Sequence, residues 1–136
     1  MTKKMFLTFG VLLIVFSMFT GISSAASATL TIGNQADIGG YLADSEGKTL
    51  YYFTKDAPGI SECKGMCTVN WPTFYTESIV VSPGLEAGDF GTMIRGDGSK
   101  QTTFRGWPLY YFVKDQVPGD MKGNKVNNVW FYIPIN

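Results

Sequence analysis

Short apolar and aromatic runs, separated by turn residues, dominate the chain after residue 28. No segment shows the sustained 3.6-residue periodicity of an amphipathic helix. Turns rich in Gly, Asp and Pro lie between the runs, as expected where the chain must reverse direction. The pattern predicts an all-β domain with strands at residues 30–32, 38–43, 49–54, 78–81, 91–94, 101–104, 109–113 and 129–133.

An aromatic heptapeptide occurs twice: LYYFTKD at 50–56 returns as LYYFVKD at 109–115, an offset of 59 residues. Two repeat units, at about 34–82 and 83–136, are therefore predicted. Each unit alone would bury too little surface to be stable, so we expect both to pack into one small, pseudo-symmetric antiparallel sandwich or barrel. The same offset superposes a glycine, an aspartate and a tryptophan in each unit: Gly47 with Gly106, Asp56 with Asp115, and Trp71 with Trp130.

Neither face of the LYYF strand is polar. Side chains alternate along a strand, so Tyr51 and Phe53 share one face, and Tyr110 and Phe112 share the matching face of the second copy. Leucine and the second tyrosine occupy the other face. Both faces are therefore expected to be largely covered by the rest of the domain.

The first 28 residues have the three-part layout of a secretory signal peptide. Lys3 and Lys4 precede an apolar run at 5–19, and an Ala-Ser-Ala cleavage site follows at 26–28. The alternative is an uncleaved membrane anchor, but the run falls short of the roughly 20 residues that a spanning helix needs. Cleavage leaves residues 29–136 as a single secreted domain, with no membrane span.

Charge and composition exclude several classes of function. The chain has 11 basic and 11 acidic residues, and loss of Lys3 and Lys4 leaves a net charge of −2, with no basic patch for nucleic acid or anionic membranes. Histidine is absent, which excludes Ser-His-Asp and Cys-His catalysis and histidine-ligated metals. We therefore predict a monomer that is not an enzyme and carries no cofactor.

The motifs together resemble a known family. Both heptapeptides contain Tyr-x-Phe-x-x-Asp, and SECKGMCTVNWP lies between them at 61–72. This combination resembles the secreted prokaryotic repeat family named for its Tyr-x-(Phe/Trp/Tyr)-x-x-Asp motif, over nearly all of residues 29–136. The resemblance implies a cell-envelope or extracellular setting and brings no established biochemical activity. Many members are lipoproteins, whereas this chain has no cysteine near the predicted cleavage site.

Cys63 and Cys67 are the only cysteines. In an exported protein such a pair most often forms a disulfide, and two cysteines four apart on a helical turn lie within bridging range. We expect a short helical turn here, stapled by a disulfide before Trp71. The alternative is a redox-active dithiol with Lys64 adjacent, although the spacing is not C-x-x-C. Two thiolates alone leave a zinc ion half-coordinated.

Asp56 and Asp115 each close an aromatic strand and precede a Pro-Gly turn. The simpler interpretation is that each carboxylate accepts a hydrogen bond from the backbone of its own loop. One alternative is that the two carboxylates bind Ca²⁺ together with Asp120. Another is a glycosidase-type carboxylate pair, for which the distance between the two carboxylates would be decisive. No catalytic residue is assigned.

The tryptophans Trp71, Trp107 and Trp130 are interpreted first as core residues, with a sugar- or protein-binding platform as the alternative. Trp107 opens a strand after a turn and is the candidate exception. The tripeptide Arg-Gly-Asp at 95–97 resembles an adhesion signal, but its Asp-Gly step is already explained by a hairpin turn.

These observations predict a non-enzymatic, secreted or cell-envelope module that binds a partner of unknown identity or serves a structural role. The alternative function is an extracellular redox or electron-transfer accessory that uses Cys63 and Cys67.

Overall fold

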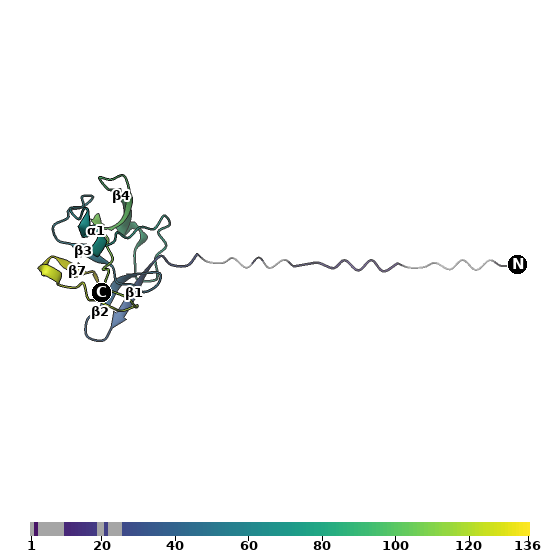
Figure 1. Ribbon diagram of the computed structural model, residues 1–136. Coiled ribbons are helices and arrows are strands. Elements are labelled where there is room, and N and C mark those ends of the chain that lie inside the picture. The colour runs from purple at the N-terminus through teal and green to yellow at the C-terminus, as the bar shows by residue number, and fades with distance from the viewer. Residues whose placement is uncertain (1, 3–9, 19–20, 22–25) are drawn as a thin grey trace.

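The computed structural model describes residues 2, 10–18, 21 and 26–136. Residues 1, 3–9, 19–20 and 22–25 of the predicted signal peptide lie outside the described residues. Residues 10–18 have no assigned helix or strand and lie apart from the folded domain (Figure 1). Within the described residues, no helix is long and apolar enough to cross a membrane.

The prediction of an all-β fold is confirmed. Residues 26–136 contain eight strands: β1 (Leu30–Gln35), β2 (Gly39–Asp44), β3 (Tyr51–Phe53), β4 (Phe90–Ile94), β5 (Lys100–Phe104), β6 (Trp107–Pro108), β7 (Trp130–Tyr132) and β8 (Pro134–Ile135). One short helix, α1 (Met66–Asn70), and two 3₁₀ turns, η1 (Ala87–Asp89) and η2 (Val126–Asn128), complete the described elements.

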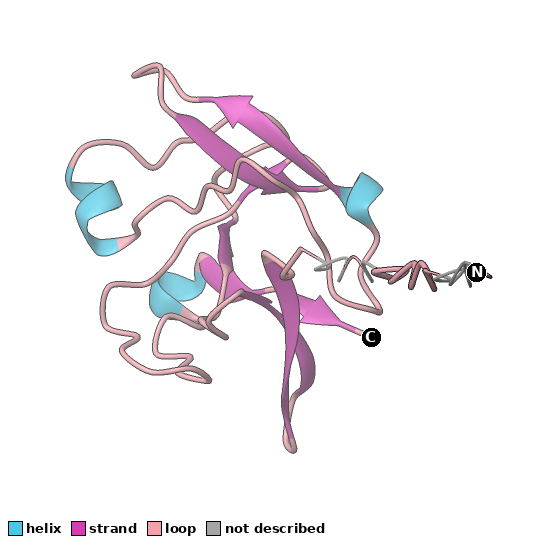
Figure 2. Ribbon diagram, turned by 90° about the vertical axis from the view of Figure 1, so that its right-hand side faces the viewer, coloured by secondary structure: helices cyan, strands magenta, loops and turns pink. Residues whose placement is uncertain are grey.

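The strands form three small antiparallel sheets, in the orders β1-β2-β8, β3-β7 and β4-β5-β6. Two hairpins, β1–β2 and β4–β5, lie at opposite ends of the domain, with the short strands between them (Figure 2). The β4–β5 hairpin turns at Asp97-Gly98, as expected, where Gly98 has φ +86°. The two repeats thus contribute one hairpin each.

The two LYYF segments meet at the centre of the domain. Tyr51 and Tyr110 form an antiparallel bridge in which each backbone N–H donates to the other's carbonyl, at 2.8 and 3.0 Å. On its other side, β3 pairs with β7. The second LYYF segment lies in the same way beside residues 70–74, where the Tyr111 N–H donates to the Pro72 carbonyl at 2.7 Å. Proline has no N–H to return, so this ladder is incomplete. The predicted strand at 109–113 is therefore reduced to bridges at Tyr110.

The predicted strand at 78–81 is wrong, because these residues make only one bridge to a neighbouring strand. Val81 makes a single parallel bridge with Leu30, and the turn at Ser82-Pro83-Gly84 follows at once. One bridge does not make a ladder. The strand β8 was not predicted; it is two residues long and begins with Pro134, a residue that is uncommon within sheets.

The helical turn predicted at the cysteines is present as α1, and the predicted disulfide is confirmed. Cys63 and Cys67 are bonded, with their Cα atoms 5.3 Å apart. The Trp71 N–H donates to the Cys67 carbonyl at 2.8 Å, so the stapled loop leads directly into the tryptophan.

Each face of the LYYF segments packs into its own cluster, as the apolar pattern predicts. Leu50 and Leu109 lie in a leucine-rich cluster between the hairpins, with Leu30, Leu42, Phe74, Phe90 and Ile133. The opposite face enters an aromatic cluster that consists of Tyr51, Phe53, Cys63, Trp71, Tyr110, Phe112 and Trp130. One segment thus serves two cores, which explains why neither of its faces is polar.

The repeated glycines permit the loop of one unit to approach the other. A Cβ added at Gly106 (φ +86°) would lie 2.8 Å from the Pro58 Cβ of the first unit. A Cβ at Gly47 (φ +81°) would lie 3.1 Å from the Pro118 Cβ of the second unit. Each glycine therefore accommodates the proline that follows the other unit's aspartate.

Gly106→Ala should destabilise the domain more than Gly98→Ala does. Both glycines have φ +86°, but a Cβ at Gly98 meets nothing within 4 Å. The backbone penalty of about 1 to 2 kcal/mol is shared, and overpacking against Pro58 adds about 1 to 3 kcal/mol at Gly106 alone. Urea unfolding of both variants measures the difference. Equal losses would show that the glycine–proline contact is unimportant.

Candidate functional site

The aspartate that closes each heptapeptide is bound by the tyrosine of the other repeat. The Tyr51 hydroxyl donates to Asp115 Oδ2 at 2.5 Å, and the Tyr110 hydroxyl donates to Asp56 Oδ2 at 2.7 Å. Both hydrogen bonds are buried and span 64 and 54 residues. The Tyr-x-Phe-x-x-Asp pattern is thus completed between the two copies and not within one.

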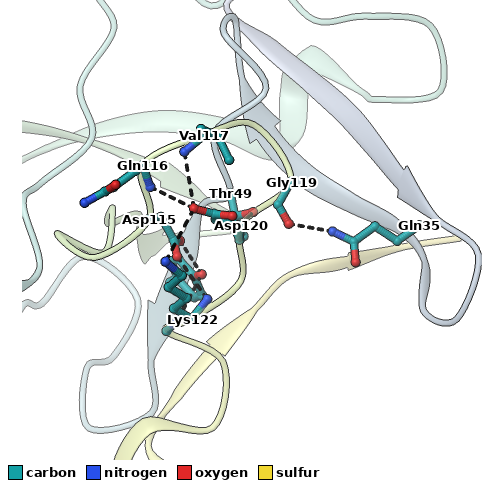
Figure 3. Close-up of polar contacts among 10 residues, drawn as sticks. Gln35, Thr49, Asp115, Gln116, Val117, Gly119, Asp120 and Lys122 are labelled. Carbon is teal, nitrogen blue, oxygen red and sulfur yellow. Dashed lines mark hydrogen bonds and ion pairs between the residues drawn. The ribbon is translucent and has the colours of Figure 1, made fainter.

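The second carboxylate oxygen of each aspartate holds its own loop. Asp56 Oδ1 accepts from the Glu62 N–H at 2.6 Å, and Asp115 Oδ1 accepts from the Lys122 N–H at 2.9 Å. The second loop is further fixed by Asp120, whose Oδ2 accepts from two backbone N–H groups (Figure 3). Each aspartate therefore fixes one loop and also ties the repeats together.

Burial raises the pKa of both aspartates above the usual value, because the ionised form loses its hydration. At Asp56 this effect is opposed by the hydrogen bonds from Glu62 and Tyr110 and by the charge of Arg95. Burial is also the main reason that the pKa of Tyr110 rises to about 12. The tyrosines therefore remain protonated donors at neutral pH.

Four aromatic rings stack between the two aspartate–tyrosine pairs. Trp71 and Trp130 lie at the centre with ring centroids 3.8 Å apart and planes within 3°. Phe53 stacks on Trp130 at 4.2 Å, and Phe112 stacks on Trp71 at 4.3 Å. Each phenylalanine thus packs on the tryptophan of the other repeat. These aromatic residues are core, as the first interpretation had it.

One side of the aromatic cluster carries a buried arginine. Arg95 Nη1 donates to Ser61 Oγ at 2.9 Å and to Gln101 Oε1 at 2.6 Å, and Nη2 donates to the Cys63 carbonyl at 2.5 Å. Ser61 Oγ lies 2.6 Å from the Tyr110 hydroxyl, which links the guanidinium to Asp56. Sequence reasoning considered Arg95 only as part of an adhesion tripeptide. Its burial removes it from that role.

The calcium candidate is not favoured by the geometry. Across the part of the chain that the structure describes, no group of three or more carboxylate, thiol or imidazole side chains could hold a metal ion. Both oxygens of Asp56 and of Asp115 already accept protein hydrogen bonds. Asp120 is engaged by Gln116 and Val117 in its own turn.

Outside this network, the two repeats have matching surface hollows beside their second tyrosines. The polar hollow, of about 490 Å³, lies beside Tyr111 and is lined by Asp44, Glu46, Lys48 and Phe74, among others. The aromatic hollow, of about 340 Å³, lies beside Tyr52 and is lined by Phe104, Arg105, Trp107 and Ile133. Trp107 therefore stands outside the buried stack, which supports its interpretation as an exception.

Comparison with known proteins identifies the repeats. A family model matches twice, at residues 34–74 and 91–133, so both copies of the heptapeptide are covered. The chain belongs to the family described as a secreted repeat of unknown function. No curated protein and no solved structure matches the chain.

The two matches of the secreted-repeat family coincide with the two halves that exchange tyrosines and aromatic rings. Within this chain, the repeated residues are thus explained by the contact between repeats. Residues that differ between the repeats, such as Arg95 and the lining of the hollows, are the better candidates for function.

Tyr51→Phe should destabilise the domain by about 1 to 3 kcal/mol, because it leaves the buried Asp115 Oδ2 without its donor. Tyr52→Phe is the matched control, since the Tyr52 hydroxyl makes no side-chain hydrogen bond within residues 26–136, and its effect should stay within about 0.5 kcal/mol. The free energy of unfolding in urea measures both. Equal effects would contradict the structural role of the hydroxyl.

The raised pKa of Asp56 predicts a pH dependence of known sign. The folded state takes up the proton before the unfolded state, whose pKa is about 3.8, so lowering the pH from 7 to 4 should stabilise the wild type relative to Asp56→Asn. Asp97 is the control, because hydrogen bonds from Ser99 lower its pKa. The wild type should lose stability relative to Asp97→Asn as the pH falls below about 4 toward this lowered pKa. If the stability difference between wild type and variant changed with pH in the same direction at both positions, the raised pKa of Asp56 would be contradicted.

Proposed function

We propose that this secreted repeat is a non-enzymatic binding module of the cell envelope or extracellular space, and that it binds through the aromatic hollow of the second repeat. The observation that carries the proposal is that one tryptophan lies at the surface while the other two lie in the core. Trp71 and Trp130 are stacked in the core, whereas Trp107 remains half-buried at the surface beside Tyr52. A concave, mostly apolar surface with a polar group at its rim is a typical ligand site.

The buried polar residues support a role without catalysis. Asp56 and Asp115 are buried carboxylates whose pKa is raised by burial, and each is held by a tyrosine and a backbone N–H. A general acid or base must reach a substrate proton. Asp56 is 5 % exposed and Asp115 is 9 % exposed, so their hydrogen bonds serve the fold.

The redox alternative has less support. Cys63 is fully buried in the aromatic cluster, and its carbonyl accepts from Arg95. Thiol–disulfide exchange needs access to a sulfur atom, and only Cys67 is half-buried, so access is restricted to that side of the bond. We therefore propose that the disulfide is a structural staple. A redox role would instead require a reduction potential well above about −300 mV.

The binding proposal is tested with the full secreted chain and envelope material from the cells that produce it. Trp107→Ala should reduce retention on this material at least fivefold, with the melting temperature checked in parallel. Ile94→Ala removes another exposed apolar side chain on β4 and should retain wild-type binding. A Cys63→Ser/Cys67→Ser variant should bind if it remains folded. Equal retention of Trp107→Ala and wild type would overturn the proposal.

A further inference from the structure

The aromatic hollow is an open surface with one charged group. Tyr52 and Trp107 meet edge to face, with ring centroids 5.8 Å apart, and Phe104 and Ile133 complete the apolar wall. Arg105 lies at the rim, and its guanidinium carbon is 4.9 Å from the centre of the Phe104 ring. The hollow therefore offers ring faces and a single cation.

The polar hollow beside Tyr111 shows how the equivalent place is built around a buried hydrogen bond. Leu50 N–H donates to the Leu42 carbonyl, and Leu109 N–H donates to the Thr102 carbonyl, both at 3.1 Å. Leu42 and Thr102 therefore occupy equivalent positions in the two repeats. Asp44 and Phe104, each two residues further along the chain, are then equivalent as well. Asp44 Oδ2 accepts from the hydroxyl of Tyr111 at 2.7 Å, the counterpart of Tyr52. Phenylalanine replaces this acceptor in the second repeat.

The charged residues beside the two hollows also differ. Aligning the glycines of the two turns places Arg105 where the first repeat has Glu46, and Trp107 where it has Lys48. The aromatic hollow thus combines a larger apolar surface with a positive rim.

Arg105 occupies a backbone conformation that arginine disfavours. It has φ +49° and Gly106 has φ +86°, and these are the two residues between the paired Phe104 and Trp107. A two-residue turn with both φ values positive favours Asn-Gly or Asp-Gly. Side chains such as arginine are rare in this region, and such outliers cluster at ligand sites. The turn holds the guanidinium at the hollow at a cost to stability.

The guanidinium is only weakly engaged by the protein. Its one ion pair in residues 26–136 is with Asp89 Oδ2 at 3.5 Å, and the Arg105 side chain is 68 % exposed. Exposed pairs of this kind contribute little. A ligand carboxylate could therefore replace Asp89 and form the bidentate contact that suits a guanidinium.

We propose that the aromatic hollow binds the carboxyl-terminal end of a peptide, with an apolar final side chain against Trp107 and Tyr52 and its α-carboxylate on Arg105. This ligand class rests on the proposed binding function of the same hollow. The lining favours a peptide over an acidic sugar, because sugar hydroxyls would meet four apolar or aromatic side chains and one cation. An apolar side chain with one carboxylate matches that composition.

The test is a calorimetric or NMR titration of the full secreted chain with N-acetyl-Ala-Ala-Phe and with its C-terminal amide. The free acid should bind at least tenfold more tightly than the amide, because a charge-assisted contact to Arg105 is lost in the amide. Trp107→Ala should weaken both peptides. Asp89→Asn should tighten the acid a few-fold and leave the amide unchanged.

Arg105→Asn separates binding from folding. Asparagine tolerates positive φ, so this variant should melt no lower than the wild type. It should nevertheless bind acid and amide equally. A variant that melts lower would contradict the strain at Arg105, and one that still prefers the acid would contradict its contact with the carboxylate.

The outcomes distinguish the ligand class from the binding function. Equal binding of acid and amide by the wild type, or no binding of either at millimolar concentration, overturns the peptide proposal. Tighter binding of a trigalacturonate probe than of the acid peptide overturns it in favour of an acidic sugar. If Trp107→Ala still loses retention on envelope material in these cases, the binding module stands. If it does not, both proposals fail.

Discussion

A buried carboxylate needs hydrogen-bond donors, and in this domain each repeat depends on the other to supply one. Tyr51 reaches Asp115 and Tyr110 reaches Asp56, while the intervening rings stack as Phe53, Trp130, Trp71 and Phe112. Tyr51 and Tyr110 are also the residues whose backbones bridge the two segments at the centre of the domain. The loop positions, the close glycines and the two cores all follow from this reciprocal contact.

Local chemistry and periodicity were enough to predict the strand-rich fold, the doubling and the disulfide. They could not show that the tyrosine of one heptapeptide binds the aspartate of the other, because pairing within one copy satisfies the same residue types. The strand predicted at 109–113 is shorter in the structure, because Pro72 on the neighbouring segment has no N–H to donate. Pro72 is distant in sequence, so the heptapeptide alone gives no sign of this. Arg95 was missed because a buried guanidinium inside a turn motif gives no sequence signal.

The differences between the repeats are as informative as the likeness. Only the first repeat carries a disulfide, and only one aspartate–tyrosine pair is backed by Arg95. The hollows diverge most, from Asp44, Glu46 and Lys48 to Phe104, Arg105 and Trp107. Trp107 could be singled out from its place after a turn. Arg105 could not, because its unusual backbone conformation is visible only in three dimensions.

The exchange between repeats also sets the order in which the chain can fold. When residues 50–56 are first synthesised, Tyr51 has no acceptor, and the aspartate that it needs lies 64 residues further on. Contacts this distant in sequence slow folding, since a large loop must close before they reward it. The first repeat therefore cannot form all of its native contacts until nearly the whole chain has been synthesised. We therefore expect the domain to fold in a single cooperative step.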